Sequence, residues 1–332
     1  MYGRKQIKSI MFTQSKAIAK GVFSLLPKAD NLLTRESAKS NHNLRYCYSV
    51  WLRHLVKLHE SSGKNVFPSM VELGPGSSIA TGILALLTGT NNYLALDVVD
   101  FTKGFNYEEI LEELILLISN KTPIPGEKEF PDVYPKLDDY SFPNHILTDS
   151  LLKETLSTKR IATIKSIIKE YNVSKRFASK DGISIQYMDE WTNKLDKLPV
   201  NFADLVLSHG VLMMVTDLDM TYKMVSKFLK KGGVTSHQID FGSLNTADKW
   251  NGHWTYSDFT WKLIMGQRSF LINRAPLQEH VDLHKEYKMK IMDVRKIYEE
   301  SEISRTDLSN RFMGLSDEDL ITRTALIQAM KE

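Results

Sequence analysis

The sequence has a single cysteine, Cys47, and no uncharged apolar run of the roughly 18 or more residues that a membrane-spanning helix requires. One cysteine can form neither an internal disulfide nor a cysteine-based zinc cluster, and it fits a reducing compartment. No unit of about 20–50 residues repeats, which excludes a solenoid or a propeller. The 332 residues are 42% hydrophobic and 25% charged, which is the balance of a globular protein with two domains or one enlarged domain.

Positive charge is concentrated near the N-terminus. Residues 1–59 hold eleven Lys or Arg against two acidic residues, a local net charge of +9, whereas the whole chain carries +3. Residues 1–27 interleave lysines with Ile, Met and Phe, which predicts a basic amphipathic helix, and they lack a secretory cleavage site. Such a helix is expected either to make peripheral contact with an anionic membrane or to pack on the protein body with its lysines in water. An RNA-binding arm is a weaker alternative, and nucleic acid is not the expected partner, because no RNA-binding signature is present.

Apolar runs and the turns between them predict an α/β fold. Met70–Leu73 has the composition of a buried strand, and a glycine-rich turn, a helix over 79–87 and a second strand over 93–99 follow it. This order forms a βαβ unit, which implies a parallel sheet. Further strands are predicted over 183–187, 203–208, 234–241, 289–294 and 325–330, and helices over 41–60, 107–119, 150–171 and 218–229. The expected fold is a doubly wound, mostly parallel, seven-stranded Rossmann-like sheet.

The predicted organisation is a basic helical extension over 1–60 followed by one α/β domain over 61–332. Residues 101–180 are much longer than one crossover helix needs, and Leu, Ile and Phe recur throughout them. We therefore expect an inserted helical cap there rather than a linker. A second segment, 241–280, follows the predicted fifth strand, at the sheet edge where α/β enzymes place their ligands.

The turn Gly74-Pro75-Gly76 has the features of a nucleotide-binding turn. Glycines allow close approach of a ligand, and the start of the next helix presents free N–H groups. A Rossmann dehydrogenase would have its third glycine where Ile79 stands, and the Gly-Lys-Ser/Thr of a P-loop is absent. Both alternatives are therefore disfavoured.

The run Glu72-Leu73-Gly74-Pro75-Gly76-Ser77-Ser78 resembles the first motif of class I S-adenosylmethionine (SAM) dependent methyltransferases, with Ser78 in place of a third glycine. The resemblance implies a transferase that uses SAM as its cofactor. It also implies that two glycines back the methionine part, that an acidic residue after the second strand takes both ribose hydroxyls, and that one after the third strand accepts from the adenine amino group. The SAM-binding residues implied in this way are Glu72, Gly74, Gly76, Asp97, Asp189, Ser208 and Arg45, the last of which either reaches the SAM carboxylate or pairs on the surface.

One departure from the family concerns the catalytic base. Many members carry Glu-His after the fourth strand, where this chain has Val211-Leu212-Met213-Met214-Val215. A base for a hydroxyl acceptor would therefore come from another residue. The candidates are His209, His237, Asp240 and His253, and no spacing of His, Asp or Glu predicts a metal site.

The acceptor is predicted to be a hydroxyl group. Ser208-His209-Gly210-Val211 is not the Pro-Pro motif usual for nitrogen methylation of nucleic-acid bases, and Cys47 lies outside the loop used for carbon methylation of pyrimidines. In segment 241–280, aromatic residues alternate with polar ones, a pattern that suits sugar rings and their hydroxyls. The predicted substrate-binding residues are Trp250, Trp254, Tyr256, Asp258 and Arg274.

Residues 44–54, 137–143 and 250–254 resemble a bacterial group of class I methyltransferases found with surface-polysaccharide biosynthesis. This resemblance implies O-methylation of a glycan or sugar-containing acceptor by a cytoplasmic protein, at the inner face of the membrane if the basic helix binds lipid. Two other functions stay open. One is a methyltransferase for a small metabolite, and the other is a catalytically inactive SAM-binding scaffold protein.

Overall fold

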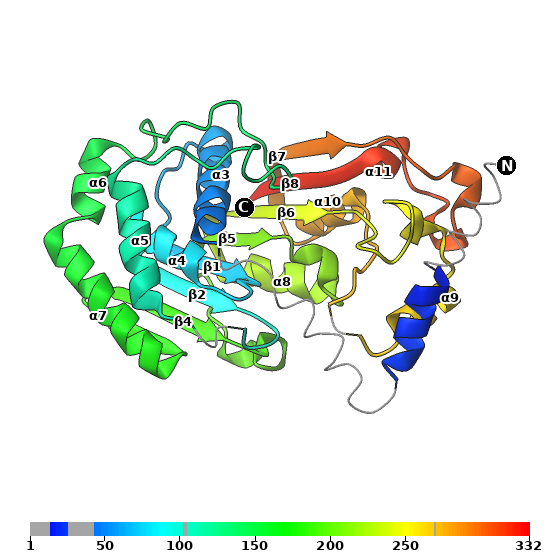
Figure 1. Ribbon diagram of the computed structural model, residues 1–332, viewed down its shortest axis with the longest axis horizontal. Coiled ribbons are helices and arrows are strands. Elements are labelled where there is room, and N and C mark those ends of the chain that lie inside the picture. The colour runs from blue at the N-terminus through cyan, green and yellow to red at the C-terminus, as the bar shows by residue number, and fades with distance from the viewer. Residues whose placement is uncertain (1–13, 26–42, 102–104, 269) are drawn as a thin grey trace.

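The computed structural model describes residues 14–25, 43–101, 105–268 and 270–332, which build an eight-stranded sheet (Figure 1). Its strands are β1 (Ser69–Leu73), β2 (Asn92–Leu96), β3 (Phe177–Lys180), β4 (Ile183–Met188), β5 (Ala203–His209), β6 (Leu229–Asp240), β7 (Met289–Tyr298) and β8 (Thr322–Lys331). Their order across the sheet is β3-β4-β2-β1-β5-β6-β8-β7, and only β3 and β8 run against the others. The order reverses between β1 and β5, where a doubly wound sheet leaves a crevice at the carboxyl ends of its strands.

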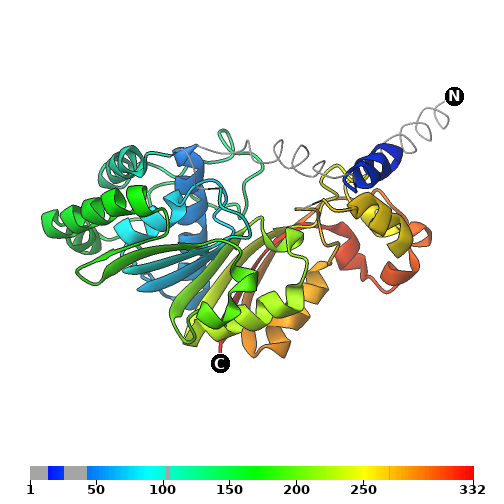
Figure 2. The same ribbon diagram turned by 90° about the horizontal axis from the view of Figure 1, so that it is seen from below.

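Helices cover both faces of this sheet (Figure 2). The labelled helices are α3 (Leu44–Ser62), α4 (Ala80–Leu87), α5 (Tyr107–Ser119), α6 (Asp149–Thr155), α7 (Thr158–Ser174), α8 (Leu218–Phe228), α9 (Asp258–Met265), α10 (Leu277–Glu286) and α11 (Asp317–Ile321). Of these, α9 packs with Ala17 in a separate cluster beyond the sheet (Figure 2). Met70 packs into the core under α3, α4, α5 and α7, whereas its neighbour Val71 packs into the core under α8 and α10. Because every residue of β1 is buried and successive side chains alternate, the strand is apolar on both faces, with Ser69 and Glu72 as the exceptions.

Most predicted elements are confirmed within a few residues, and the differences have local causes. The sheet is mixed and has eight strands rather than seven, because β3 adds an antiparallel edge to β4. The predicted helix over 150–171 is two helices, α6 and α7, which separate at Leu156–Ser157. Residues 230–233, after α8, form a bulge in β6, and regular pairing with β5 resumes at Val234. The expected α/β class is therefore correct.

Helices α5 and α7 of residues 101–180 cover the sheet, and the predicted role of this insertion as a cap over the acceptor remains a prediction. Leu111 and Leu114 of α5 and Ile164 and Ile167 of α7 are fully buried in the core on the α3 face. Helix α7 also contacts β3 and β4. The insertion thus provides much of the layer on that face, and each buried aliphatic side chain there contributes about 1.5–3 kcal/mol of hydrophobic stabilisation.

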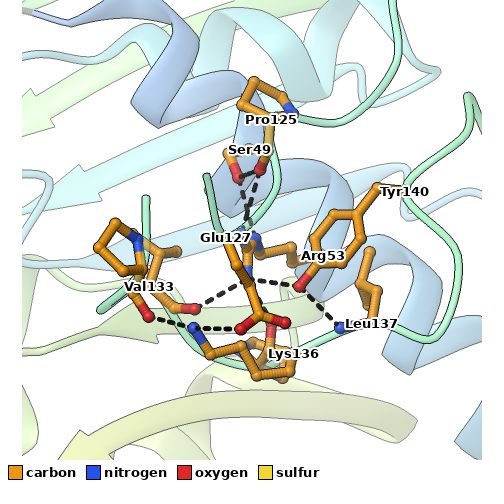
Figure 3. Close-up of polar contacts among 10 residues, drawn as sticks. Ser49, Arg53, Pro125, Glu127, Val133, Lys136, Leu137 and Tyr140 are labelled. Atoms are coloured by element: carbon orange, nitrogen blue, oxygen red, sulfur yellow. Dashed lines mark hydrogen bonds and ion pairs between the residues drawn. The ribbon is translucent and has the colours of Figure 1, made fainter. Parts of the chain in front are cut away.

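A buried arginine joins the proline-rich part of this insertion to α3 (Figure 3). The Arg53 side chain is 0% exposed and donates to the carbonyls of Val133, Pro135 and Pro125 at 2.7, 3.0 and 3.0 Å. It also donates to Ser49 Oγ at 2.9 Å, and its guanidinium lies 4.9 Å from the centre of the Tyr140 ring. Among the residues that the structure describes, no carboxylate bonds to it directly, so carbonyl oxygens and an aromatic ring satisfy the buried charge.

The N-terminal region contains two different parts. Helix α3 belongs to the core, because Trp51, Leu52 and Leu55 are at most 1% exposed and pack under the sheet with Met70. Residues 14–23 are also helical, and Ala17 packs beside α9. The rest of the predicted basic helix, residues 1–13 and 26–27, lies outside the described residues. Among the helices described, none combines the length and the apolar character needed to cross a bilayer.

Candidate functional site

The glycine-rich turn between β1 and α4 forms one wall of the candidate site. Gly74 and Gly76 have φ angles of 64° and 67°, which residues with a side chain rarely adopt. The N–H of Gly74 donates to the carbonyl of Leu96 at 2.8 Å and ties the turn to the end of β2. A Cβ atom at Gly74 would lie 2.6 Å from the Val211 side chain, whereas one at Gly76 would meet nothing within 4 Å. The turn is therefore packed against the residues after β5 and open at Gly76.

Asp97 directly follows β2, and the turn holds its carboxylate in place. Oδ2 accepts from the N–H of Gly76 at 3.1 Å, and Oδ1 accepts from the N–H of Val98 at 2.8 Å. Burial raises the pKa of Asp97 to about 6, although the backbone hydrogen bonds favour its charged form. The N–H of Val99 also favours the charged form, so backbone donors on both sides fix the orientation of the carboxylate. A fixed pair of acceptors of this kind suits two neighbouring hydroxyl groups.

Glu72 is a second acidic group beside the turn. It is 6% exposed, and its Oε2 accepts from the Tyr93 hydroxyl at 2.5 Å. Burial raises the pKa of Glu72 to about 7, Asp97 adds to the rise, and hydrogen bonds from Tyr93 and Thr81 oppose it. A positively charged ligand group nearby would favour the ionised form of both acids. The turn therefore offers glycines and two acids, the combination predicted from the sequence.

Two other predicted SAM-binding residues already have charged partners. Asp189 directly follows β4 and accepts from Arg176 at 2.8 Å and from Lys194 at 3.1 Å. Burial acts to raise the pKa of Asp189, but these two partners hold it below its ordinary value. Arg45 makes a two-pronged contact with Glu129, with both bonds at 2.7 Å, so it forms the surface pair that was one of its two predicted roles. Binding of SAM by Asp189 remains a prediction.

The end of β5 carries two predicted residues, and they face opposite sides of the sheet. Ser208 is 0% exposed, and its Oγ lies 2.8 Å from Nδ1 of His237 on β6. His209 is partly exposed, and its Nδ1 lies 3.1 Å from Nε2 of His54 on α3. Because Ser208 is enclosed, its side chain does not face the crevice, and the expected contact with SAM is not what the structure shows.

A cluster of buried histidines lies on the α8 and α10 face. His237, His280 and His284 are each 0% exposed, and Tyr222 lies between them, with its hydroxyl 2.9 Å from Nδ1 of His280. Burial lowers the pKa of His280 to about 3 and that of His284 to about 4. The predicted role of His237 as a base facing the acceptor is therefore wrong, because its ring is enclosed in the core. Across the described part of the chain, no three His, Cys, Asp or Glu side chains are placed to hold a metal ion.

The remaining predicted bases differ in accessibility. His253 is 1% exposed and packs on Trp254 with ring centres 4.7 Å apart, and burial lowers its pKa to about 3. Its predicted role is wrong for the same reason as that of His237. Asp240 ends β6 with its side chain 29% exposed, and it accepts from Arg323 and from the N–H of Gly242. Asp240 and His209 thus remain at strand ends and accessible.

The predicted sugar-binding residues pack mainly on one another. Trp254 is 0% exposed and donates from Nε1 to the carbonyl of Arg274 at 3.0 Å. Arg274, 2% exposed, donates to the Tyr256 carbonyl at 2.8 Å and to Asp258 at 2.7 Å. Trp254, Tyr256 and Arg274 therefore form a core, which corrects their predicted role on a stacking surface. Trp250, partly exposed and bonded to the Glu300 carbonyl, and Asp258 remain accessible.

Sequence reasoning missed the contribution of α3 to this site. His54 is fully buried and lies between His209 of β5 and Ser236 of β6. The one available signal was a histidine on the apolar side of a helix, beside Trp51 and Leu55. Such a histidine is usually a core residue, and its partner His209 lies 155 positions along the chain.

Among the comparisons with known proteins, the one with solved structures found matches. No family model matches the chain, and no curated protein matches it. A SAM-dependent methyltransferase from Mesorhizobium loti is 13% identical, with 83% of this chain and 96% of that one covered and a TM-score of 0.39. A SAM-dependent methyltransferase from Methanosarcina mazei is 12% identical, with coverages of 82% and 96% and a TM-score of 0.42. A putative sarcosine dimethylglycine methyltransferase from Galdieria sulphuraria is 11% identical, with coverages of 84% and 84% and a TM-score of 0.40.

These structural neighbours are SAM-dependent methyltransferases, the class of enzyme that the sequence motif predicts. With TM-scores below 0.5, the likeness carries no argument about the activity of this chain. The assignment therefore rests on the site.

Proposed function

We propose that this protein is a SAM-dependent methyltransferase. The observation that supports this most directly is the carboxylate of Asp97, which the N–H groups of Gly76 and Val98 hold at the end of β2, beside the glycine-rich turn. The open space at Gly76 fits a ligand lying against the turn. Glu72, Gly74, Gly76 and Asp97 would hold SAM, which supplies a methyl group on a positively charged sulfur when bound. The protein would align this group with the acceptor and exclude water.

We propose a hydroxyl as the methyl acceptor, with a glycan or sugar-containing molecule as the first candidate. The sequence resemblance supports the glycan, and the accessible Trp250 and Asp258 leave two of the five predicted contacts available. A small metabolite is the second candidate, and one observation favours it. Burial of Trp254 and Tyr256 removes two of the aromatic faces on which a sugar would stack.

Replacement of Asp97 by alanine should abolish most SAM affinity and leave the fold intact. Loss of two hydrogen bonds to a charged group removes about 3 kcal/mol, which is roughly a 100-fold rise in the dissociation constant. The measurement is calorimetric titration of wild type and Asp97→Ala with SAM and with S-adenosylhomocysteine. Asp196→Ala, on an exposed aspartate, is the matched control and should bind as the wild type does.

Two results of this titration would count against the proposal. A well-folded wild type that binds neither ligand would overturn it, and equal affinity in Asp97→Ala would remove the role of Asp97. Transfer of a labelled methyl group to nucleotide sugars, oligosaccharides, lipid-linked sugars and small hydroxylated metabolites then decides between acceptors. Binding of SAM without transfer to any of them would favour the inactive scaffold.

We further propose that the N-terminal helix makes peripheral contact with an anionic membrane, at its cytoplasmic face. Lys16 and Lys20 are exposed on residues 14–23, and Val22, Phe23 and Leu25 are about half exposed beside them. Apolar side chains and lysines together suit the interface of an anionic bilayer.

The membrane proposal predicts sedimentation with vesicles of phosphatidylglycerol and phosphatidylcholine that weakens with salt. Replacing both Lys16 and Lys20 by glutamate should remove most of this binding, because each lysine near an anionic surface contributes about 1 kcal/mol. Lys223→Glu, on an exposed lysine of α8, should bind as the wild type does. Equal sedimentation of wild type and the double variant would rule the contact out.

A further inference from the structure

Four polar side chains from four elements form a hydrogen-bonded chain on the α3 face of the sheet. Nδ1 of His209 lies 3.1 Å from Nε2 of His54, and Nδ1 of His54 lies 2.7 Å from Oγ of Ser236. Ser236 Oγ lies 3.0 Å from the side-chain amide of Gln328 on β8. His54, Ser236 and Gln328 are fully buried, whereas His209 is partly exposed. The chain thus runs from the interior to the end of β5.

These hydrogen bonds decide which ring nitrogens carry protons. Gln328 satisfies all its partners when its nitrogen donates to two groups of α3, at 2.7 and 2.9 Å, and its oxygen accepts from Ser236. The Ser236 hydroxyl proton is then used, so Ser236 accepts from Nδ1–H of His54. His54 is left with a bare Nε2, which accepts from Nδ1–H of His209. The lone pair on Nε2 of His209 has no hydrogen-bond partner among the described residues.

The position of His209 connects this hydrogen-bonded chain of side chains to the glycine-rich turn. Val211, two residues further on, packs on Gly74, and the N–H of Gly210 donates to the carbonyl of Gln238 at 3.0 Å. Residues 211–215 carry no polar side chain that could act as a base. His209 is therefore the ionisable side chain that β5 brings to the crevice beside the turn.

We propose that His209 accepts the proton of the methyl acceptor and that His54 is the residue that positions it. This inference rests on the proposed O-methyltransferase function. As the acceptor oxygen bonds to the methyl carbon, the electron pair of the carbon–sulfur bond stays on sulfur, and the hydroxyl proton moves to Nε2 of His209. The bond from Nδ1–H to His54 holds the ring in the tautomer that has this lone pair. The hydrogen-bonded chain ends on the side-chain amide of Gln328, which does not take up a proton. The proton therefore leaves to water from Nε2 of His209 after the product departs.

The surroundings keep the His209 ring neutral between turnovers. Burial, and then the charge of Arg53, lower the pKa of His209 to about 4. The Tyr46 ring of α3 lies edge-on to it at 6.1 Å between centres. A neutral imidazole keeps its lone pair at physiological pH, and the acceptor proton becomes strongly acidic as the methyl bond forms, so a weak base suffices.

The test is nuclear magnetic resonance of the full chain labelled with ¹⁵N-histidine at neutral pH, in which long-range ¹H–¹⁵N correlations distinguish protonated from bare ring nitrogens. His54→Gln and His209→Gln variants assign the two rings. Both histidines are expected to carry their proton on Nδ1. A proton on Nε2 of His209 in the wild type would overturn the proposal, because the one remaining lone pair would then face His54.

A pair of variants at Ser236 tests the positioning role. Ser236→Ala removes the acceptor for Nδ1–H of His54, so both rings should lose their preference for that tautomer, and Ser236→Thr should restore it. If both histidine rings keep their proton on Nδ1 in Ser236→Ala, the positioning role given to the hydrogen-bonded side chains is contradicted.

Kinetics test the catalytic role with an acceptor identified in the transfer assay. The His209→Gln variant should lose about 100-fold or more in kcat with SAM affinity unchanged, and a kcat equal to wild type would overturn the role of His209. A protein with the expected tautomers that binds no SAM would refute the proposed function, and with it the catalytic role of His209, but not the hydrogen-bonded arrangement of the two rings. One that binds SAM with Nε2 of His209 protonated would refute only this inference.

Discussion

Lowering the pH from about 7.5 to about 5.5 should destabilise this protein by several kcal/mol. The cause is a set of six histidines, five enclosed in the fold and one, His209, partly exposed, and for each of them burial is the largest influence on the pKa. Burial lowers the pKa to about 4 in His209 and His284 and to about 3 in His253 and His280. It lowers the pKa well below its ordinary value in His54 and His237.

The direction follows from proton binding in the two states. An unfolded histidine takes up a proton below about pH 6.5, whereas these six in the folded protein stay neutral until a lower pH. The unfolded state therefore binds more protons in this window, and stability that is fully present above pH 6.5 is lost as the pH falls towards 4. At pH 5.5 each histidine costs about 1 kcal/mol, or roughly 6 kcal/mol together.

Two acids at the site oppose this loss. Burial raises the pKa of Glu72 to about 7 and that of Asp97 to about 6. Because their pKa values are raised in the folded state, these acids take up protons there at a higher pH than in the unfolded state. As the pH falls, this adds roughly 2–3 kcal/mol to the free energy of unfolding. The net loss of about 3–4 kcal/mol is a large part of the total stability of a typical protein, which is about 5–15 kcal/mol.

Urea unfolding followed by tryptophan fluorescence at several pH values between 7.5 and 5.5 measures this effect. His253→Gln should be less sensitive to acid than wild type by about 1 kcal/mol over that range. His145→Gln, on an exposed histidine, is the control and should follow the wild-type curve. A free energy of unfolding that is flat from pH 7.5 to 5.5 would contradict the prediction.

The sequence was most informative where local chemistry alone decides the structure. The helix predicted over residues 107–119 has the bounds of α5. The structure shows why its start is locally defined, since Asn106 caps the first turn and Glu108 and Glu109 follow. Strand β1 and the turn after it were recognisable because a buried apolar run meets two glycines. Asp97 was found in the same way, since it directly follows the next strand.

Elements that depend on distant partners were predicted less well. Strand β3 has one buried residue, Ala178, among its four, so its sequence shows no apolar pattern. It is a strand because it pairs with β4. Lys230-Lys231-Gly232-Gly233 directly follows the end of α8, as its composition predicts, but the fold also makes it a bulge between two paired parts of β6.

The side chains of the candidate site likewise depend on distant partners that the sequence does not reveal. Sequence order located Asp189 and Arg45, but it could not show that Arg176 and Lys194 bind the first or that Glu129, 84 positions away, binds the second. It also could not distinguish an accessible histidine such as His209 from an enclosed one, because burial is decided by the packing of several elements.

Replacing Arg53 by alanine should destabilise the protein by about 3–5 kcal/mol. The substitution leaves the carbonyls of Val133 and Pro135 without their guanidinium donor, whereas the carbonyl of Pro125 keeps its bond from Ser49 Oγ at 2.7 Å (Figure 3). Each buried acceptor left without a partner costs about 1–3 kcal/mol, and the vacated volume adds to this. The effect should be concentrated in residues 123–140, which Arg53 joins to α3.

Two further arginine variants make this prediction specific. Arg45→Ala removes an arginine from the same helix, but that side chain is 40% exposed and pairs with Glu129 on the surface, so the change should stay within about 1 kcal/mol. Arg53→Lys keeps the charge and loses the planar fork that reaches three carbonyls at once, so it should recover only part of the lost stability. Urea unfolding gives the three free energies, and limited proteolysis shows whether cleavage of Arg53→Ala begins within 123–140. Equal losses in Arg45→Ala and Arg53→Ala would mean that burial of Arg53 contributes nothing beyond a surface contact.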